Sequence, residues 1–223
     1  LAVVLFGRYG GGVNGGPVAG HTPNAPQVAR PSTSEVLYQE GRDHLDRLNG
    51  AARARSVLEV AVLLAPADAR IHAALGEAYA RLALRAPRPA LWPLAGVEVN
   101  LALALDGRLA RGHAALGFLR AYRDWDFSGA RAAFEQALAL DPGDAHVRSG
   151  FASVLRASGL IAGAIVERRR ACEQLPLQPE LWSQLGMDLV FAREYGEAAA
   201  AFQRALRLSP GFIMAIDGLA GAW

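Results

Sequence analysis

Residues 179–210, PELWSQLGMDLVFAREYGEAAAAFQRALRLSP, decide the fold. Apolar residues recur at helical spacing in both halves of this stretch, with Trp182 and Gly186 in the first half and Ala198 and Phe202 in the second. Small residues let neighbouring helices approach, and large rings fill the space between them. The stretch therefore predicts two helices that pack against each other as a hairpin.

The same pattern returns upstream at a constant interval. Three sets of residues recur every 34 positions: Pro142, Pro176 and Pro210; Ala137, Ala171 and Ala205; Ala130, Ala164 and Ala198. A period of this length is typical of the tetratricopeptide repeat, a helix–turn–helix unit. We expect an all-α tetratricopeptide-repeat α-solenoid, a right-handed superhelix of helix hairpins with five full repeats and a truncated sixth.

Composition agrees with a helical core and excludes some functions. The chain is 52% hydrophobic and 20% charged, so it can bury a substantial core. Its net charge of +2 is small and its arginines are scattered, so we expect no direct nucleic-acid binding by this chain. The single cysteine, Cys172, excludes an internal disulfide and is expected to be a small buried residue rather than a reactive thiol.

The first 33 residues differ from the rest. Residues 1–6, LAVVLF, are too few to cross a bilayer, which takes about 20 apolar residues. They fit the end of a transmembrane helix, which would place a membrane anchor upstream of Gly7, or the tail of a signal peptide. Residues 7–33 are rich in glycine and proline and predict a flexible linker. The repeat domain is then residues 34–223.

The sequence shows no arrangement of residues that indicates catalysis, a cofactor or a metal site, and we expect no enzyme. Asp124 and Asp126 flank a tryptophan, but they fall in a turn between two helices, where Asp126 is expected to cap the second helix. The histidines are spread one per repeat and are expected to be packing residues rather than metal ligands; they are His44, His72, His113 and His146.

Arg168 departs from the repeat because it stands where a Phe or Leu would normally pack. We expect its methylene groups to cover the core while its guanidinium reaches water.

The first helices of such a stack line a concave face that holds partner segments. The repeat pattern turns thirteen residues toward this face: Arg70, Glu77, Arg81, Arg111, Phe118, Tyr122, His146, Ser149, Ser153, Arg156, Ser183, Met187 and Phe191. Arginines grip carboxylates and aromatic rings supply apolar anchors, so an acidic or C-terminal peptide is the expected guest. The alternative is that these arginines only solvate the surface.

The segments YQEGRDHLDRLNG, ALGEAYARLAL, DWDFSGA and LWSQLGMDLVFAREYGEAAAAFQRALRLSPGF carry a closer resemblance. Over residues 34–223 the chain resembles the C-terminal repeat region of bacterial CadC-type winged-helix transcriptional regulators. The resemblance implies the sensory or interaction domain of a membrane-anchored regulator in signal transduction, with the repeats on the periplasmic or the cytoplasmic side. Similar regions follow some bacterial serine/threonine kinases and nucleotide cyclases, and a periplasmic envelope-assembly scaffold is a further alternative.

Overall fold

The computed structural model describes residues 31–47, 49–85 and 90–221. The predicted membrane-helix end at residues 1–6 and the predicted linker as far as residue 30 lie outside the described residues. In the described part the chain forms eleven helices and no strand. The helices are α1 (Thr33–Leu45), α2 (Ala51–Leu64), α3 (Ala69–Arg85), α4 (Leu91–Leu105), α5 (Ala110–Tyr122), α6 (Phe127–Leu140), α7 (Ala145–Ala157), α8 (Ile161–Gln174), α9 (Pro179–Phe191), α10 (Tyr195–Leu208) and α11 (Ile213–Gly221).

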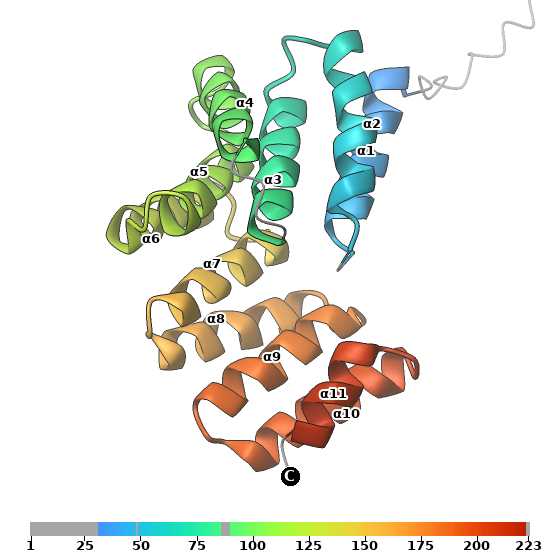
Figure 1. Ribbon diagram of the computed structural model, residues 1–223, viewed down its shortest axis with the longest axis vertical. Coiled ribbons are helices and arrows are strands. Elements are labelled where there is room, and N and C mark those ends of the chain that lie inside the picture. Colours follow the sequence, from blue (N-terminus) through green and yellow to red (C-terminus); the bar gives the residue numbers. More distant parts are fainter. Residues whose placement is uncertain (1–30, 48, 86–89, 222–223) are drawn as a thin grey trace, which may run out of the picture. The chain divides into compact units, whose positions relative to one another are not determined.

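Consecutive helices pair into hairpins, and the hairpins stack in chain order (Figure 1). The five hairpins are α1–α2, α3–α4, α5–α6, α7–α8 and α9–α10, and α11 packs on the last of them. First helices also touch the first helix of the next hairpin, as α3 does with α5 and α5 with α7. The predicted all-α stack of five hairpins and half of another is confirmed.

Close packing of small against large residues holds each hairpin together. A Cβ atom added at Gly117 would lie 2.6 Å from the ring of Phe134, and one added at Gly186 would lie 2.7 Å from the ring of Phe202. Both phenylalanines are fully buried. The first helix therefore needs glycine at this position so that the ring of the second helix can lie against its backbone.

A second recurring contact joins each hairpin to the preceding one. A side chain in the first turn of the first helix reaches a backbone carbonyl six residues earlier, at the end of the previous hairpin. The pairs are His72 Nε2 with Pro66 O at 2.9 Å, His113 Nε2 with Gly107 O at 3.0 Å, Arg148 with Pro142 O at 2.8 Å, and Trp182 Nε1 with Pro176 O at 2.9 Å. The packing role predicted for His72 is confirmed, since only 3% of it is exposed.

The aspartates at the turn between α5 and α6 are structural. Asp126 is the N-cap of α6 and accepts a hydrogen bond from the amide of Gly129 at 2.8 Å, as predicted. This bond lowers the pKa of Asp126, and a hydrogen bond from Arg123 lowers the pKa of Asp124. Both groups therefore hold their negative charge, whereas a general acid needs a raised pKa.

Cys172 is also structural. It is 1% exposed in α8, which confirms its predicted burial, and burial raises the pKa of its thiol to about 12. Because the thiolate is the reactive form, this cysteine is an apolar packing residue near neutral pH.

Candidate partner-binding groove

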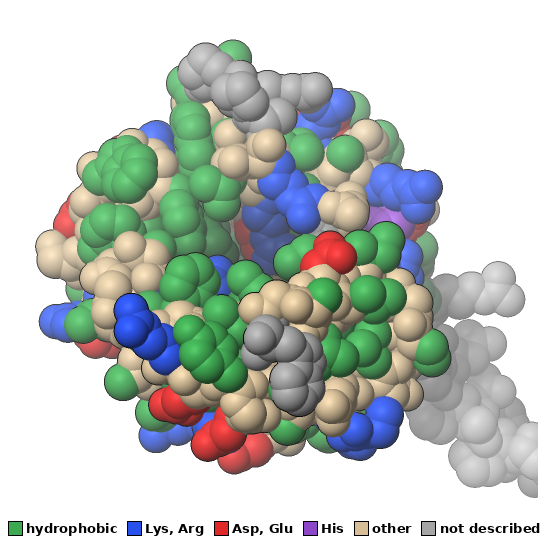
Figure 2. Space-filling view, turned by 60° about the horizontal axis from the view of Figure 1, so that its bottom comes forward, with side chains coloured by type: hydrophobic (Ala, Val, Ile, Leu, Met, Phe, Trp, Pro, Cys, Tyr) green, Lys and Arg blue, Asp and Glu red, His purple; other side chains and the backbone are tan. Residues whose placement is uncertain are grey.

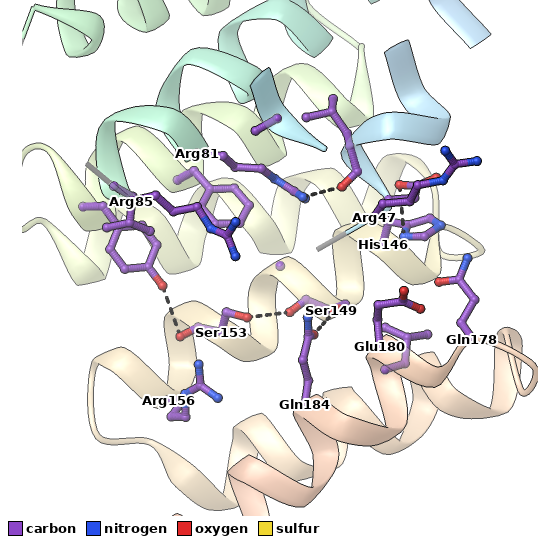
Figure 3. A pocket seen from close by; sticks show the side chains of 18 residues that line it. Arg47, Arg81, Arg85, His146, Ser149, Ser153, Arg156, Gln178, Glu180 and Gln184 are labelled. Carbon is purple, nitrogen blue, oxygen red and sulfur yellow. Dashed lines mark hydrogen bonds and ion pairs between the residues drawn. The ribbon is translucent and has the colours of Figure 1, made fainter. Parts of the chain in front are cut away.

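A hollow of about 270 Å³, called here the inner groove, lies on the side formed by the first helices. Residues of α3, α5, α7 and α9 line it, together with the end of α1 and the turn that follows. Arginine side chains gather inside the hollow, with an acidic patch at its rim (Figure 2). Arg81 and Arg85 enter from α3, while Arg156 and Glu180 lie on the opposite side (Figure 3).

The inner groove brings together seven of the thirteen residues that the repeat pattern turned inward: Arg81, Phe118, Tyr122, His146, Ser149, Ser153 and Arg156. Two more, Glu77 and Arg111, line a narrower pocket beside it, with Phe118 and His146 shared between the two. These nine residues come from α3, α5 and α7, so the groove is centred on the middle repeats.

The other four predicted residues lie elsewhere in the described structure. Arg70 stacks over the ring of Tyr38, 4.9 Å from its centroid, and Ser183 is buried. Met187 is partly buried against the core around α9 and α10. Phe191 is 57% exposed beneath the guanidinium of Arg156, whose Cζ lies 5.6 Å from the ring centroid.

The groove arginines are anchored but not fully used. Arg81 contacts Glu77 at 2.6 Å and donates to the carbonyl of Leu45 at 2.6 Å. Arg156 contacts Asp188 at 2.9 Å through one nitrogen. A guanidinium has five N–H donors, so each retains donors for a ligand. Arg85 donates to Asn49, and it is exposed.

Glu77 balances the charge beneath the groove. Its carboxylate lies 2.8 Å from Arg42 and 2.6 Å from Arg81. Burial alone would raise the pKa of Glu77, but these two guanidinium groups lower it to about 2. Glu77 thus stays ionised and keeps Arg81 directed along the groove wall.

This shift predicts a pH dependence of stability. Because the folded pKa of about 2 lies below the ordinary 4.5, ionised Glu77 stabilises the folded chain above pH 4.5, and that contribution is lost as the pH falls toward 2. We expect Glu77→Gln to remove on the order of 2 kcal/mol of acid-dependent stability. Urea unfolding of both proteins across this acid range measures the effect. Parallel losses in wild type and variant would contradict it.

The expectation that the guanidinium of Arg168 reaches water is wrong. Arg168 is fully buried in α8. It donates to Asp188 Oδ2 at 2.9 Å, to the carbonyl of Ser149 at 2.8 Å, to Gln184 Oε1 at 2.5 Å and to Ser153 Oγ at 3.0 Å. Asp188, also fully buried, accepts from Arg156 as well. Arg168 thus ties α7, α8 and α9 together directly below the groove.

The repeat register explains this network. Arg168 occupies the position of Phe134 and Phe202, while Asp188, 34 residues after Val154, occupies an otherwise apolar position. Gln184 likewise stands where Gly150 and Gly218 stand in the neighbouring repeats. Buried charge is tolerated only when paired and hydrogen-bonded, and these polar replacements supply the partners. The departures at 184 and 188 were the sequence signal that could have located Arg168 in the core.

Residues from the first hairpin complete the groove. Asp46 Oδ1 lies 3.3 Å from His146 Nδ1, which joins the turn after α1 to α7, and Arg47 lines the groove beside them. Burial lowers the pKa of His146. Single-repeat reasoning missed Arg47 and Arg85, because the stacking of several hairpins brings residues about 100 positions apart in the chain to the same hollow.

Within the described residues, no helix is long and apolar enough to span a membrane, and no cluster of three potential metal ligands occurs.

Stacked helix hairpins around a groove lined by first helices define a helical-repeat protein of the tetratricopeptide type. Residues 179–212 match the tetratricopeptide repeat family. No curated protein sequence matches the chain.

Solved structures show the same fold. TTC0263, a thermophilic TPR protein of Thermus thermophilus, is similar with a TM-score of 0.65 at 18% identity, over 85% of this chain and 98% of that one. YrrB, described as a TPR protein with an unusual peptide-binding site, gives 0.52 at 16% identity, over 82% and 97%. IFIT1, solved with m7Gppp-AAAA, gives 0.69 at 18% identity, over 85% of this chain and 46% of that one. The chain is therefore an all-α tetratricopeptide-repeat solenoid.

Proposed function

We propose that the chain is a non-enzymatic scaffold that holds an acidic segment of a protein partner in the inner groove. The observation that carries the proposal is the charge of the groove lining. Four arginines line it, Arg47, Arg81, Arg85 and Arg156, against two carboxylates, Asp46 and Glu180. A carboxylate-bearing segment would offset this excess of positive charge.

Aromatic side chains support a peptide as the ligand. Phe118 and Tyr122 lie side by side at the groove wall, with ring centroids 5.8 Å apart. Flat apolar surfaces beside bidentate donors suit a peptide that carries both a carboxylate and an apolar side chain. The similar protein YrrB is described as having a peptide-binding site, which supports this ligand class by analogy. Under the alternative, that these arginines only solvate the surface, such a peptide would not bind.

Charge reversal at Arg85 tests the proposal. Arg85 is exposed and bonds only to the Asn49 side chain among the described residues, so Arg85→Glu should leave the fold intact. We expect it to weaken binding of a synthetic peptide with glutamate, phenylalanine and a free C-terminal carboxylate about tenfold, equivalent to roughly 1.4 kcal/mol. Titration calorimetry measures the change.

Arg131→Glu on α6 is the matched control, because Arg131 is exposed outside the groove and the change in net charge is the same. Equal affinities of the two variants, or no binding by the wild type, would overturn the proposal.

The cellular role is proposed from the sequence resemblance alone. We propose that the scaffold serves as the sensory or interaction domain of a membrane-anchored bacterial transcriptional regulator. A winged-helix domain encoded in the same reading frame would support this role. A kinase or cyclase domain there would favour the regulatory region of a signalling enzyme, and a cleaved signal peptide would favour a periplasmic scaffold.

A further inference from the structure

A second hollow, of about 310 Å³, lies on the other side of α9, between α8 and α10. We call it the outer groove. Its floor is formed by Trp182, Leu185 and Leu189 of α9, and small residues of α10, Ala200 and Ala201, leave the space open. The inner groove instead uses Leu181 and Gln184 of the same helix. The two grooves therefore occupy different faces of α9 and share no lining residue.

The rim of the outer groove is cationic. Arg169 of α8 and Arg204 and Arg207 of α10 line it, against the single carboxylate of Glu197. Arg169 pairs with Glu197, and Arg204 lies over the indole of Trp182, 5.9 Å from the ring centroid. Arg207 is exposed and makes no ion pair with any described residue. The rim thus keeps positive charge that nothing within the described chain neutralises.

This charge is specific to one groove rather than a property of the repeat. One repeat earlier, 34 residues upstream, Glu135 stands at the position of Arg169 and Glu173 at the position of Arg207. Only Arg170, equivalent to Arg204, keeps its sign there, and it pairs with Glu167. Helix packing alone does not require arginine at these exposed sites, because the earlier repeat folds with the opposite charge.

We propose that the outer groove is a second docking site, and that its occupant is a protein segment in which acidic side chains alternate with apolar ones. The apolar side chains would rest on Leu185 and Leu189, and the carboxylates would meet Arg204 and Arg207 at the rim. A nucleic acid fits less well. Arg204 already covers the indole of Trp182, and Ala200 and Ala201 offer no surface for base stacking.

The test uses the 223-residue chain and a fluorescein-labelled peptide of alternating glutamate and leucine, followed by fluorescence anisotropy. Ala200→Trp fills the groove without changing the charge, and Ala132→Trp, at the equivalent exposed position of α6, is its matched control. We expect Ala200→Trp to weaken binding at least tenfold, Arg207→Glu to weaken it several-fold, and Ala132→Trp to leave it unchanged. Thermal unfolding checks that the variants fold.

Binding that is lost in Ala200→Trp but kept in Arg85→Glu supports the outer groove. Binding that is lost only in Arg85→Glu overturns this inference and leaves the inner groove as the binding site. No binding by the wild type, or equal binding by the two tryptophan variants, also overturns it. A labelled single-stranded oligonucleotide that binds the wild type and is displaced by Ala200→Trp would assign the groove to nucleic acid and overturn the inference.

Discussion

Replacing Asp188 by valine is expected to destabilise the fold by about 3–5 kcal/mol, the cost of breaking a buried ion pair from one side. Asp188 is fully buried and is the carboxylate that faces the fully buried Arg168 at 2.9 Å. Arginine cannot escape by losing its proton, so the variant must bury an uncompensated charge or expose the core. Urea unfolding with a full denaturant curve measures the loss.

A control and a rescue make this result specific. Glu135→Val removes one partner of the exposed pair between Arg131 and Glu135, 3.5 Å apart, and should cost no more than about 1 kcal/mol. Combining Asp188→Val with Arg168→Phe and Ala152→Gly, the residues found in other repeats, should restore much of the loss, because apolar packing then replaces the pair. A cost below about 1 kcal/mol for Asp188→Val alone would show that Arg168 is solvated after all.

Truncating Phe202 to alanine is expected to cost about 3–5 kcal/mol, because it empties a fully packed site. The Phe202 ring is completely buried in α10, and a Cβ atom added at Gly186 of α9 or at Gly218 of α11 would clash with it. The ring therefore fills the space where three helices meet, and their backbones cannot collapse onto a methyl group without moving the stack. Thermal and chemical unfolding both report the loss.

Phe191→Ala is the matched control, since this phenylalanine is 57% exposed at the end of α9 and the same atoms are removed. Its expected cost is within about 0.5–1 kcal/mol. Similar losses for the two variants would contradict the view that the hairpins are joined by buried ring-on-glycine contacts.

The repeat period could be read from sequence because its signal is local. Glycine against phenylalanine within one hairpin, as at Gly117 and Phe134, places two residues at constant spacing, and each repeat restates the pattern. The N-cap at Asp126 was predictable for the same reason, since capping involves residues three apart. Each of these depends only on neighbours in the chain.

Arg168 and the groove lining could not be read in this way. A single arginine at an apolar position suggested a solvated side chain, and only the coincidence of Asp188 and Gln184 on α9 shows that its partners are buried with it. Arg47 faces His146 and Arg156 across the hollow because several hairpins stack between them, and the small rotations between hairpins are not encoded in any one repeat.

Amide chemical-shift mapping of the isotopically labelled chain, titrated with the glutamate- and phenylalanine-containing peptide, tests the central claim most directly. The inner groove predicts saturable shifts that include Arg81, Tyr122 and Arg156, from α3, α5 and α7. Shifts absent from these three helices at peptide saturation would contradict it.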